Sequence, residues 1–307
     1  MLLSPVFEAS LAFRLEGQLD PMRTKSIESS FGNITAFVDD VITDQINEFG
    51  NHTRPEFAFA LSVIEAGMNV FDLGAHIGTF TLPAVQKMRG VGNFLSVEGN
   101  PETFDVLVEN CSQVASTALT HKFEKIFVAP DQNYGFTFDD KDRGAGHLVA
   151  LEKEASEDDI SIKSLDKLCE DHFYPDFVKI DLEGSEFLSL ESATEIFSNN
   201  PILYLEVSER QLNRFGHRIQ HVNAFLEAKG YKFFVNTGER NAKHDVYSIR
   251  EIRSLNQYKI FYDVLCIHED SALYGSLTKA VEKIGLLKSW RYYLNLRRIL
   301  NFLKPRL

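Results

Sequence analysis

Residues 69–80 read NVFDLGAHIGTF, an apolar run that turns through two glycines into the start of a helix. Gly74 has no side chain, so the backbone can bend sharply there and a ligand can approach closely. The N–H groups at the start of the following helix supply hydrogen-bond donors and partial positive charge. Asp72, at the carboxyl end of the run, adds a charge that suits an amino group. The stretch predicts a strand, a turn and a helix that hold a nucleoside-bearing cofactor.

The spacing of the glycines selects among such cofactors. A dinucleotide fingerprint reads G-x-G-x-x-G and presents bare donors to a pyrophosphate. Here the glycines are Gly74 and Gly78, and an acid lies at the entrance. That combination favours a zwitterionic amino acid with a neighbouring sulfonium, as in S-adenosylmethionine. A tight turn with a purely structural role is the alternative.

A second acid, Glu98, ends the next apolar run, LSVEGN, 26 residues beyond Asp72. Doubly wound folds place near this position the carboxylate that holds the ribose hydroxyls. A carboxylate accepts both hydrogen bonds of a vicinal diol and repels a phosphorylated ribose; a solvent-exposed glutamate at a strand end is the alternative. The predicted cofactor contacts are Asp72, Gly74, Ala75, His76, Gly78, Glu98, Asn100 and, facing an adenine amino group, Asp131.

Short apolar runs alternate with helical patterns along the chain, which is typical of an α/β fold with a parallel sheet and helices on both faces. The predicted strands are residues 69–73, 93–97, 125–129, 177–180, 202–207, 231–235 and 259–268. The predicted helices are residues 55–65, 78–88, a segment that begins after Asn100 and Pro101, 185–197 and 217–228. We expect residues 131–159 to form a surface excursion with a small hairpin, and residues 236–257 to form a long connection near the substrate.

Composition limits the classes of partner. Acidic residues outnumber basic ones by 44 to 32, so the net charge of −12 opposes binding to nucleic acid. The three cysteines, Cys111, Cys169 and Cys266, lie far apart and their number is odd, which favours a reducing, cytoplasmic setting. Glu8 and Arg14 interrupt the opening residues MLLSPVFEASLAFRLEG, and no uninterrupted run of about 18 apolar residues occurs, so we expect neither a cleaved signal nor a membrane span.

We expect three parts in the chain: a lead-in arm at 1–54, the cofactor-binding domain at 55–270 and an extension at 271–307. Within the extension, residues 285–307 carry six basic residues and no acid among aromatic and aliphatic ones. This pattern predicts a basic amphipathic helix that contacts an anionic membrane surface or a partner. Packing on the domain itself or on a second subunit of a homodimer is the alternative.

Several stretches together resemble the FkbM family of S-adenosylmethionine-dependent methyltransferases. They are VFDLGAHIGTFTL, VEGNPETFDVLVENC, SIKSLDKL, PDFVKIDLEGSEFLSLE and PILYLEV. The similarity extends from about Thr35 to His268, and VKIDLEGSE is its most specific part. The chain departs from the family at His76, where asparagine is common, and at Gly99, where proline is common.

The resemblance implies a Rossmann-like class I methyltransferase with a seven-stranded, mostly parallel sheet that ends in an antiparallel hairpin. It also implies methyl transfer to a hydroxyl, mostly of glycans or other small metabolites. It assigns cofactor contacts to Asp72, Gly74, Gly78 and Glu98, and places Asp181 at the mouth of the fourth strand.

Three acids are the candidates for catalysis. Asp181 and Glu183 lie in KIDLEGSE and Glu206 lies in YLEV, each at a strand's carboxyl end. Crowded carboxylates either raise the pKa of one member, which then acts as a base, or hold a divalent cation. We favour a base without a metal. Capping of the next helix is the alternative for Glu183 and for Glu186.

The sequence thus predicts an S-adenosylmethionine-dependent O-methyltransferase that acts on a saccharide or other small polar acceptor. Two other functions remain open: a nicotinamide-dependent oxidoreductase, and a binding or scaffold protein that retains the fold without catalysis.

Overall fold

The computed structural model describes residues 24–52, 54–112, 119–130, 134–139, 142–150, 161–236, 249–257 and 261–278. Two expectations fall outside this part of the chain: the adenine contact at Asp131 and the basic helix at 285–307. Among the described residues, no helix has both the length and the apolar character needed to cross a bilayer. The division at residues 54 and 270 stays a prediction.

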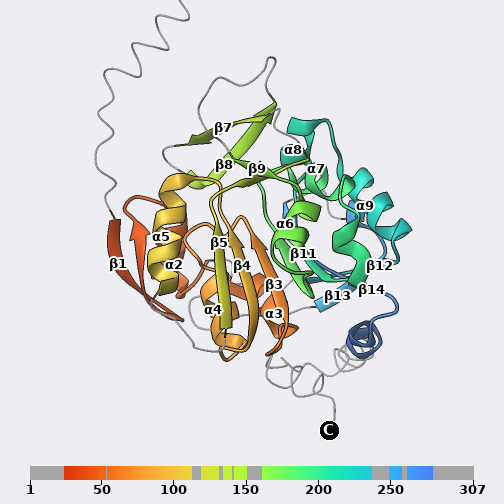
Figure 1. Cartoon of the computed structure of the whole chain (residues 1–307), viewed down its shortest axis with the longest axis horizontal. Coiled ribbons are helices and arrows are strands. Elements are labelled where there is room, and N and C mark those ends of the chain that lie inside the picture. Colours follow the sequence, from red (N-terminus) through yellow and green to blue (C-terminus); the bar gives the residue numbers. More distant parts are fainter. Residues whose placement is uncertain are drawn as a thin grey trace, which may run out of the picture.

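Eight strands form the central sheet, in the order β13-β12-β14-β11-β10-β3-β4-β5 (Figure 1). The five strands from β11 to β5 run parallel, whereas β14 is antiparallel to both of its neighbours and β13 is antiparallel to β12. The predicted mostly parallel sheet is therefore confirmed. The strands are β3 (Asn69–Leu73), β4 (Gly92–Val97), β5 (Leu119–Glu124), β10 (Phe177–Ile180), β11 (Ile202–Val207), β12 (Tyr231–Asn236), β13 (Ile249–Ile252) and β14 (Tyr262–His268).

The expected number of seven strands is wrong, because β13 adds an eighth within the segment predicted as a connection. Its sequence is IREI, in which Ile249 and Ile252 are buried and the two charged residues between them are exposed. β13 lies at the edge of the sheet, so only one neighbour covers it. Four residues with this pattern show neither a continuous apolar run nor a strict alternation.

The third predicted strand, 125–129, is also wrong. The strand that pairs with β4 is β5, LTHKFE, which lies at the opposite edge of the sheet and is half-exposed along its length. The apolar run after it forms the short strand β6 (Phe127–Val128), which pairs with β9 (Ile162–Lys163) outside the main sheet. The run did indicate burial, since Ile126 and Val128 belong to the main core.

Side chains of the sheet alternate between two apolar layers, as expected when helices cover both faces. Val70, Phe94 and Phe177 belong to one layer, which includes residues of α3 and α4. Phe71 and Leu95 belong to the other layer, which includes residues of α6, α7 and α9. The five predicted helical segments are confirmed. The helices are α3 (Arg54–Ser62), α4 (Thr81–Lys87), α5 (Pro101–Ser112), α6 (Leu165–Asp171), α7 (Glu186–Glu191), the 3-10 helix η1 (Glu195–Asn199), α8 (Glu209–Leu212) and α9 (Ile219–Ala228).

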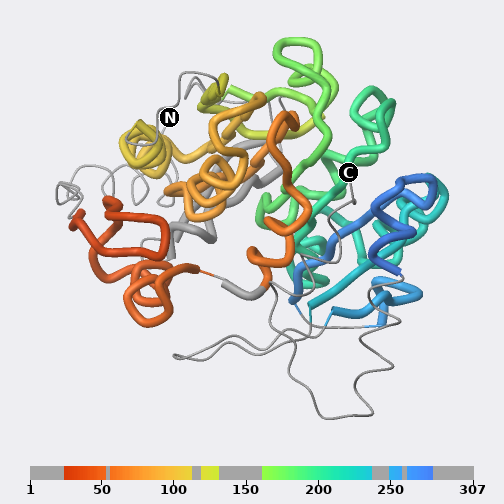
Figure 2. The backbone as a smooth tube through the Cα atoms, turned by 90° about the horizontal axis from the view of Figure 1, so that it is seen from below, coloured from red at the N-terminus to blue at the C-terminus, as the bar shows by residue number. Residues whose placement is uncertain are grey.

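Two hairpins flank the sheet. The first, β1 (Thr24–Ser29) with β2 (Gly32–Phe37), is followed by α2 (Val41–Phe49) and packs on α5, where the side chain of Asn110 bonds both backbone groups of Thr35. No pattern predicted these elements. The second, β7 (Tyr134–Asp139) with β8 (Asp142–Ala150), is the predicted hairpin of the surface excursion. Figure 2 shows the N-terminal elements and the strands β12 to β14 on opposite sides of the molecule.

Candidate functional site

The strand order places a topological switch point between β3 and β10. From β3 the chain continues to β4 and β5 on one side, and β10 continues to β11 on the other. Ligands of open α/β sheets bind in the crevice outside the carboxyl ends of the strands at such a point. The predicted site residues that the structure describes lie at these ends, on β3, β4, β10 and β11 and in the turns that follow them.

The turn after β3 is held in place by backbone groups of Val97 and Asp181, so only part of it is open to a ligand. Gly74 has a φ of +77°, and a Cβ there would overlap the carbonyl oxygen of Asp181. The N–H groups of Gly74 and Ala75 both donate to the carbonyl of Val97, at 3.0 and 2.9 Å. Glycine is therefore needed for close backbone packing, and the N–H groups of Gly74 and Ala75 are already bonded within the protein.

Asp72 is fully buried and points into the protein. Its Oδ2 accepts a hydrogen bond from Thr81 Oγ1 at 2.6 Å, and its Oδ1 lies 3.3 Å from Lys179 Nζ. Burial raises the pKa of Asp72, and Lys179 and Thr81 oppose that rise. The buried carboxylate of Asp72 therefore holds Lys179 and the start of the helix after the turn in position.

Lys179, for which the sequence predicts no role, joins the two central strands. Its ammonium donates to the carbonyl of Gly74 at 2.9 Å and lies 3.2 Å from Asp181 Oδ2, and its side chain is 3% exposed. Burial disfavours the charge, but the carboxylates of Asp181 and Asp72 outweigh it and raise the pKa of Lys179. The signal in the sequence was a lysine in FVKI, a strand otherwise apolar and buried on both faces.

Glu98 joins the ends of β3 and β4. Its Oε2 accepts from the backbone N–H of His76 at 2.8 Å, and its Oε1 accepts from the N–H of Asn100 at 2.9 Å. Desolvation raises the pKa of Glu98, and these two donors oppose the rise. The side chain stays partly exposed, and each carboxylate oxygen can accept a further hydrogen bond. Glu98 can therefore still receive the two hydroxyls of a ribose.

The remaining predicted contacts support this arrangement. His76 has a φ of +50°, which directs its N–H toward Glu98. Gly78 has a φ of +95°, and a Cβ there would lie 3.2 Å from Leu107 on α5. Asn100 is buried, and its Oδ1 accepts from the N–H of Glu102 at the start of α5.

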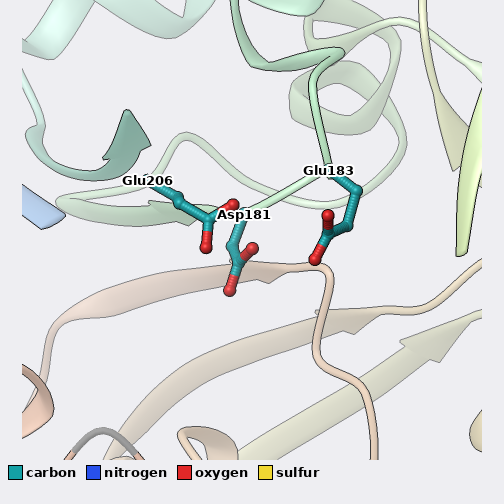
Figure 3. A group of neighbouring side chains, drawn as sticks. All are labelled: Asp181, Glu183 and Glu206. Carbon is teal, nitrogen blue, oxygen red and sulfur yellow. The ribbon is translucent and has the colours of Figure 1, made fainter. Parts of the chain in front are cut away.

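Asp181, Glu183 and Glu206 form an acidic cluster, and each offers a carboxylate oxygen within 4.8 Å of the others. Figure 3 shows Asp181 between the other two carboxylates. Glu183 has a φ of +53° and accepts a hydrogen bond from Gln211. Glu206 is 9% exposed, and burial together with the charges of Asp181 and Glu183 raises its pKa well above the ordinary value.

Two further acids lie beside the cluster and have different roles. Asp263 faces Glu206 across the antiparallel pair of β11 and β14, and burial together with Asp181 raises its pKa to about 7. Glu186 accepts from the N–H groups of Leu182 and Gly184, both at 3.0 Å, and burial raises its pKa to about 7. Glu186 thus holds the turn that precedes α7, and no side-chain capping bond is made at the N-cap residue Ser185. Asp263 was missed because only strand pairing places it near the cluster.

The strand order and the acids at the switch point are those of a Rossmann-like α/β protein. Residues 72–233, more than half of the chain, match the family described as Methyltransferase FkbM domain. The chain therefore belongs to the FkbM methyltransferase family, as its sequence predicts.

The chain is also similar to solved structures. A precorrin-6y C5,15-methyltransferase from Geobacter metallireducens is 15% identical, with 73% of this chain and 94% of that chain covered and a TM-score of 0.39. TYW2 from M. jannaschii, in complex with AdoMet, is 12% identical, with 80% and 86% covered and a TM-score of 0.41. The magnesium protoporphyrin IX methyltransferase from Synechocystis, with bound SAM, is 11% identical, with 69% and 76% covered and a TM-score of 0.37. No curated protein matches the chain.

Proposed function

We propose that the protein transfers a methyl group from S-adenosylmethionine to a hydroxyl of a saccharide or another small polar molecule. The observation that supports this most is the cluster of Asp181, Glu183 and Glu206 at the carboxyl ends of β10 and β11, beside the cofactor edge formed by β3 and β4. Carboxylates accept hydrogen bonds, so the cluster suits an acceptor that presents hydroxyl groups. The net charge of −12 disfavours nucleic acid as the acceptor.

The described residues fit the donor. Glu98 can receive the ribose diol, because the residue is partly exposed and backbone donors hold its two oxygens in place. The turn offers little to a pyrophosphate, because the N–H groups of Gly74 and Ala75 bond Val97 and that of His76 bonds Glu98. This arrangement disfavours a nicotinamide dinucleotide and so the oxidoreductase alternative.

When bound, S-adenosylmethionine supplies a methyl group whose bond to sulfur breaks with its electron pair left on sulfur, while the acceptor oxygen forms the new bond to carbon and loses its proton. The chain's own part is to hold the hydroxyl in line and to accept its hydrogen bond. We assign that contact to the acidic cluster, with Asp181 nearest the switch point. A positioned proton acceptor contributes about 10² to 10⁴ in rate.

Calorimetry and a transfer assay test the proposal. The purified protein should bind S-adenosylmethionine and not NAD, and should transfer radiolabelled methyl to members of a panel of monosaccharides, oligosaccharides and nucleotide sugars. Asp181→Asn should retain cofactor binding and lose transfer by about 10²-fold or more. Glu191→Gln is the matched control, since Glu191 is an exposed acid on α7 that faces His217. Binding of NAD alone would refute the function, and full turnover in Asp181→Asn would remove Asp181 from its role.

A further inference from the structure

The spacing of the three clustered carboxylates matches that of ligands around one metal ion. Oxygens bound to a single Mg²⁺ or Ca²⁺ at about 2.0–2.6 Å lie no more than about 4–5 Å apart. One carboxylate oxygen from each of Asp181, Glu183 and Glu206 lies within 4.8 Å of the other two. Because the three side chains come from the end of β10, the turn after it and β11, the backbone holds them from separate points. The geometry therefore suits a shared hard cation.

A second observation is the state of Glu206. Its side chain is more than nine-tenths buried, and Oε2 makes no hydrogen bond to any described group. A buried carboxylate oxygen without a partner costs free energy, so such atoms normally have a ligand, a water or an ion. The carboxylate lacks a partner that a cation would supply.

The nearby lysine does not fill this place. Lys179 Nζ lies 3.3 Å from Asp72, 3.2 Å from Asp181 and 2.9 Å from the carbonyl of Gly74. Within the described part of the chain, no lysine or arginine forms an ion pair with Glu206. Lys179 thus balances the acids on the β3 side, and Glu206 has no cationic side chain as a partner among the described residues.

We propose that Asp181, Glu183 and Glu206 together bind one divalent cation, and that the cation orients a pair of acceptor hydroxyls. Three carboxylates without sulfur or imidazole are ligands of Mg²⁺, Mn²⁺ or Ca²⁺. Asp181 and Glu183 are partly exposed, so coordination positions stay open on the solvent side. Neighbouring saccharide hydroxyls are oxygen ligands of the same kind. The orienting role rests on the proposed methyl transfer, and it differs from the metal-free base that we favour from the sequence alone.

Titration with Mn²⁺, followed by the electron paramagnetic resonance signal of the free ion, tests the site without cofactor or acceptor. After treatment with EDTA and its removal, the full chain should bind one Mn²⁺ per molecule. Glu206→Gln and Asp181→Asn should each weaken binding by about tenfold or more, because a charged ligand is lost. Glu191→Gln should bind as the wild type does. Circular dichroism shows whether each variant is folded. The test needs only one of Glu206→Gln and Asp181→Asn to fold.

The outcomes separate this inference from the proposed function. Absence of saturable Mn²⁺ binding, or equal binding in the wild type and in a folded Glu206→Gln variant, overturns the cation site. Full methyl transfer after removal of all metal also overturns it, and leaves the function standing. Mn²⁺ binding that depends on Glu206, in a protein that binds no S-adenosylmethionine, supports the site and refutes the function.

Discussion

Replacement of Lys179 by methionine should destabilise the protein strongly. The ammonium lies 3.3 Å from Asp72 Oδ1 and 3.2 Å from Asp181 Oδ2, and it donates to the Gly74 carbonyl. Methionine keeps most of the volume but leaves the fully buried Asp72 without a countercharge. Removal of one partner from a buried pair costs about 3–5 kcal/mol, a large part of the about 5–15 kcal/mol that stabilises a typical domain.

Urea denaturation followed by circular dichroism measures this loss. Lys167→Met is the matched control, because Lys167 is half-exposed and pairs with Glu170 and Asp171 at the surface, where little stability is expected from the pair. The double variant Lys179→Met with Asp72→Asn should recover part of the loss, since it also removes the uncompensated charge. A loss for Lys179→Met no larger than that of the control would refute the reasoning.

Three further changes test the turn, the cofactor edge and the sheet edge. Gly74→Ala should cost at least about 1–3 kcal/mol in thermal or urea unfolding, because of the positive φ and the overlap with Asp181, and an unchanged midpoint would contradict this packing. Glu98→Gln should weaken S-adenosylmethionine binding about tenfold or more in calorimetry, and equal affinity would remove Glu98 from the ribose site. Burial lowers the pKa of His121 from 6.5 to about 4, so its contribution to stability is complete above pH 6.5 and is lost as the pH falls toward 4, by up to about 3 kcal/mol. His121→Phe keeps a ring in place and should lack this part of the pH dependence. If the stability of the variant and that of the wild type changed equally between pH 6.5 and 4, the role of His121 would be contradicted.

The sequence predicted those strands whose burial is uniform. β3, β10 and β11 are buried along nearly all their length and therefore appear as mostly apolar runs, each with a single charged residue. The edge strands β5 and β13 are covered by one neighbour each, and their half-exposed residues form no such run. A hydrophobic pattern in the sequence indicates which residues are buried. It indicates which residues pair in a sheet only where the paired strands are also buried.

The site shows the same limit in its polar residues. Spacing and resemblance placed Asp181, Glu183 and Glu206 correctly together, because each follows or ends a recognisable strand. Lys179 and Asp263 act through cross-strand register, which no local pattern contains: Lys179 pairs with Asp72, and Asp263 pairs with Glu206. The side chain of Asp72 likewise points inward to Thr81 because of the face of β3 on which it lies, and the local sequence does not specify that face.

The distribution of charge across the switch point links the two halves of the site. Lys179 offsets Asp72 and Asp181 and, through the Gly74 carbonyl, fixes the turn that carries the N–H bonded to Glu98. Beyond it, Glu206 has no lysine or arginine partner among the described residues. A site that retains uncompensated negative charge attracts cations and disfavours anionic acceptors. A sulfonium donor, a divalent cation and a neutral polyol acceptor each suit that potential, so the same few side chains account for the proposed donor, the proposed metal and the uncharged class of acceptor.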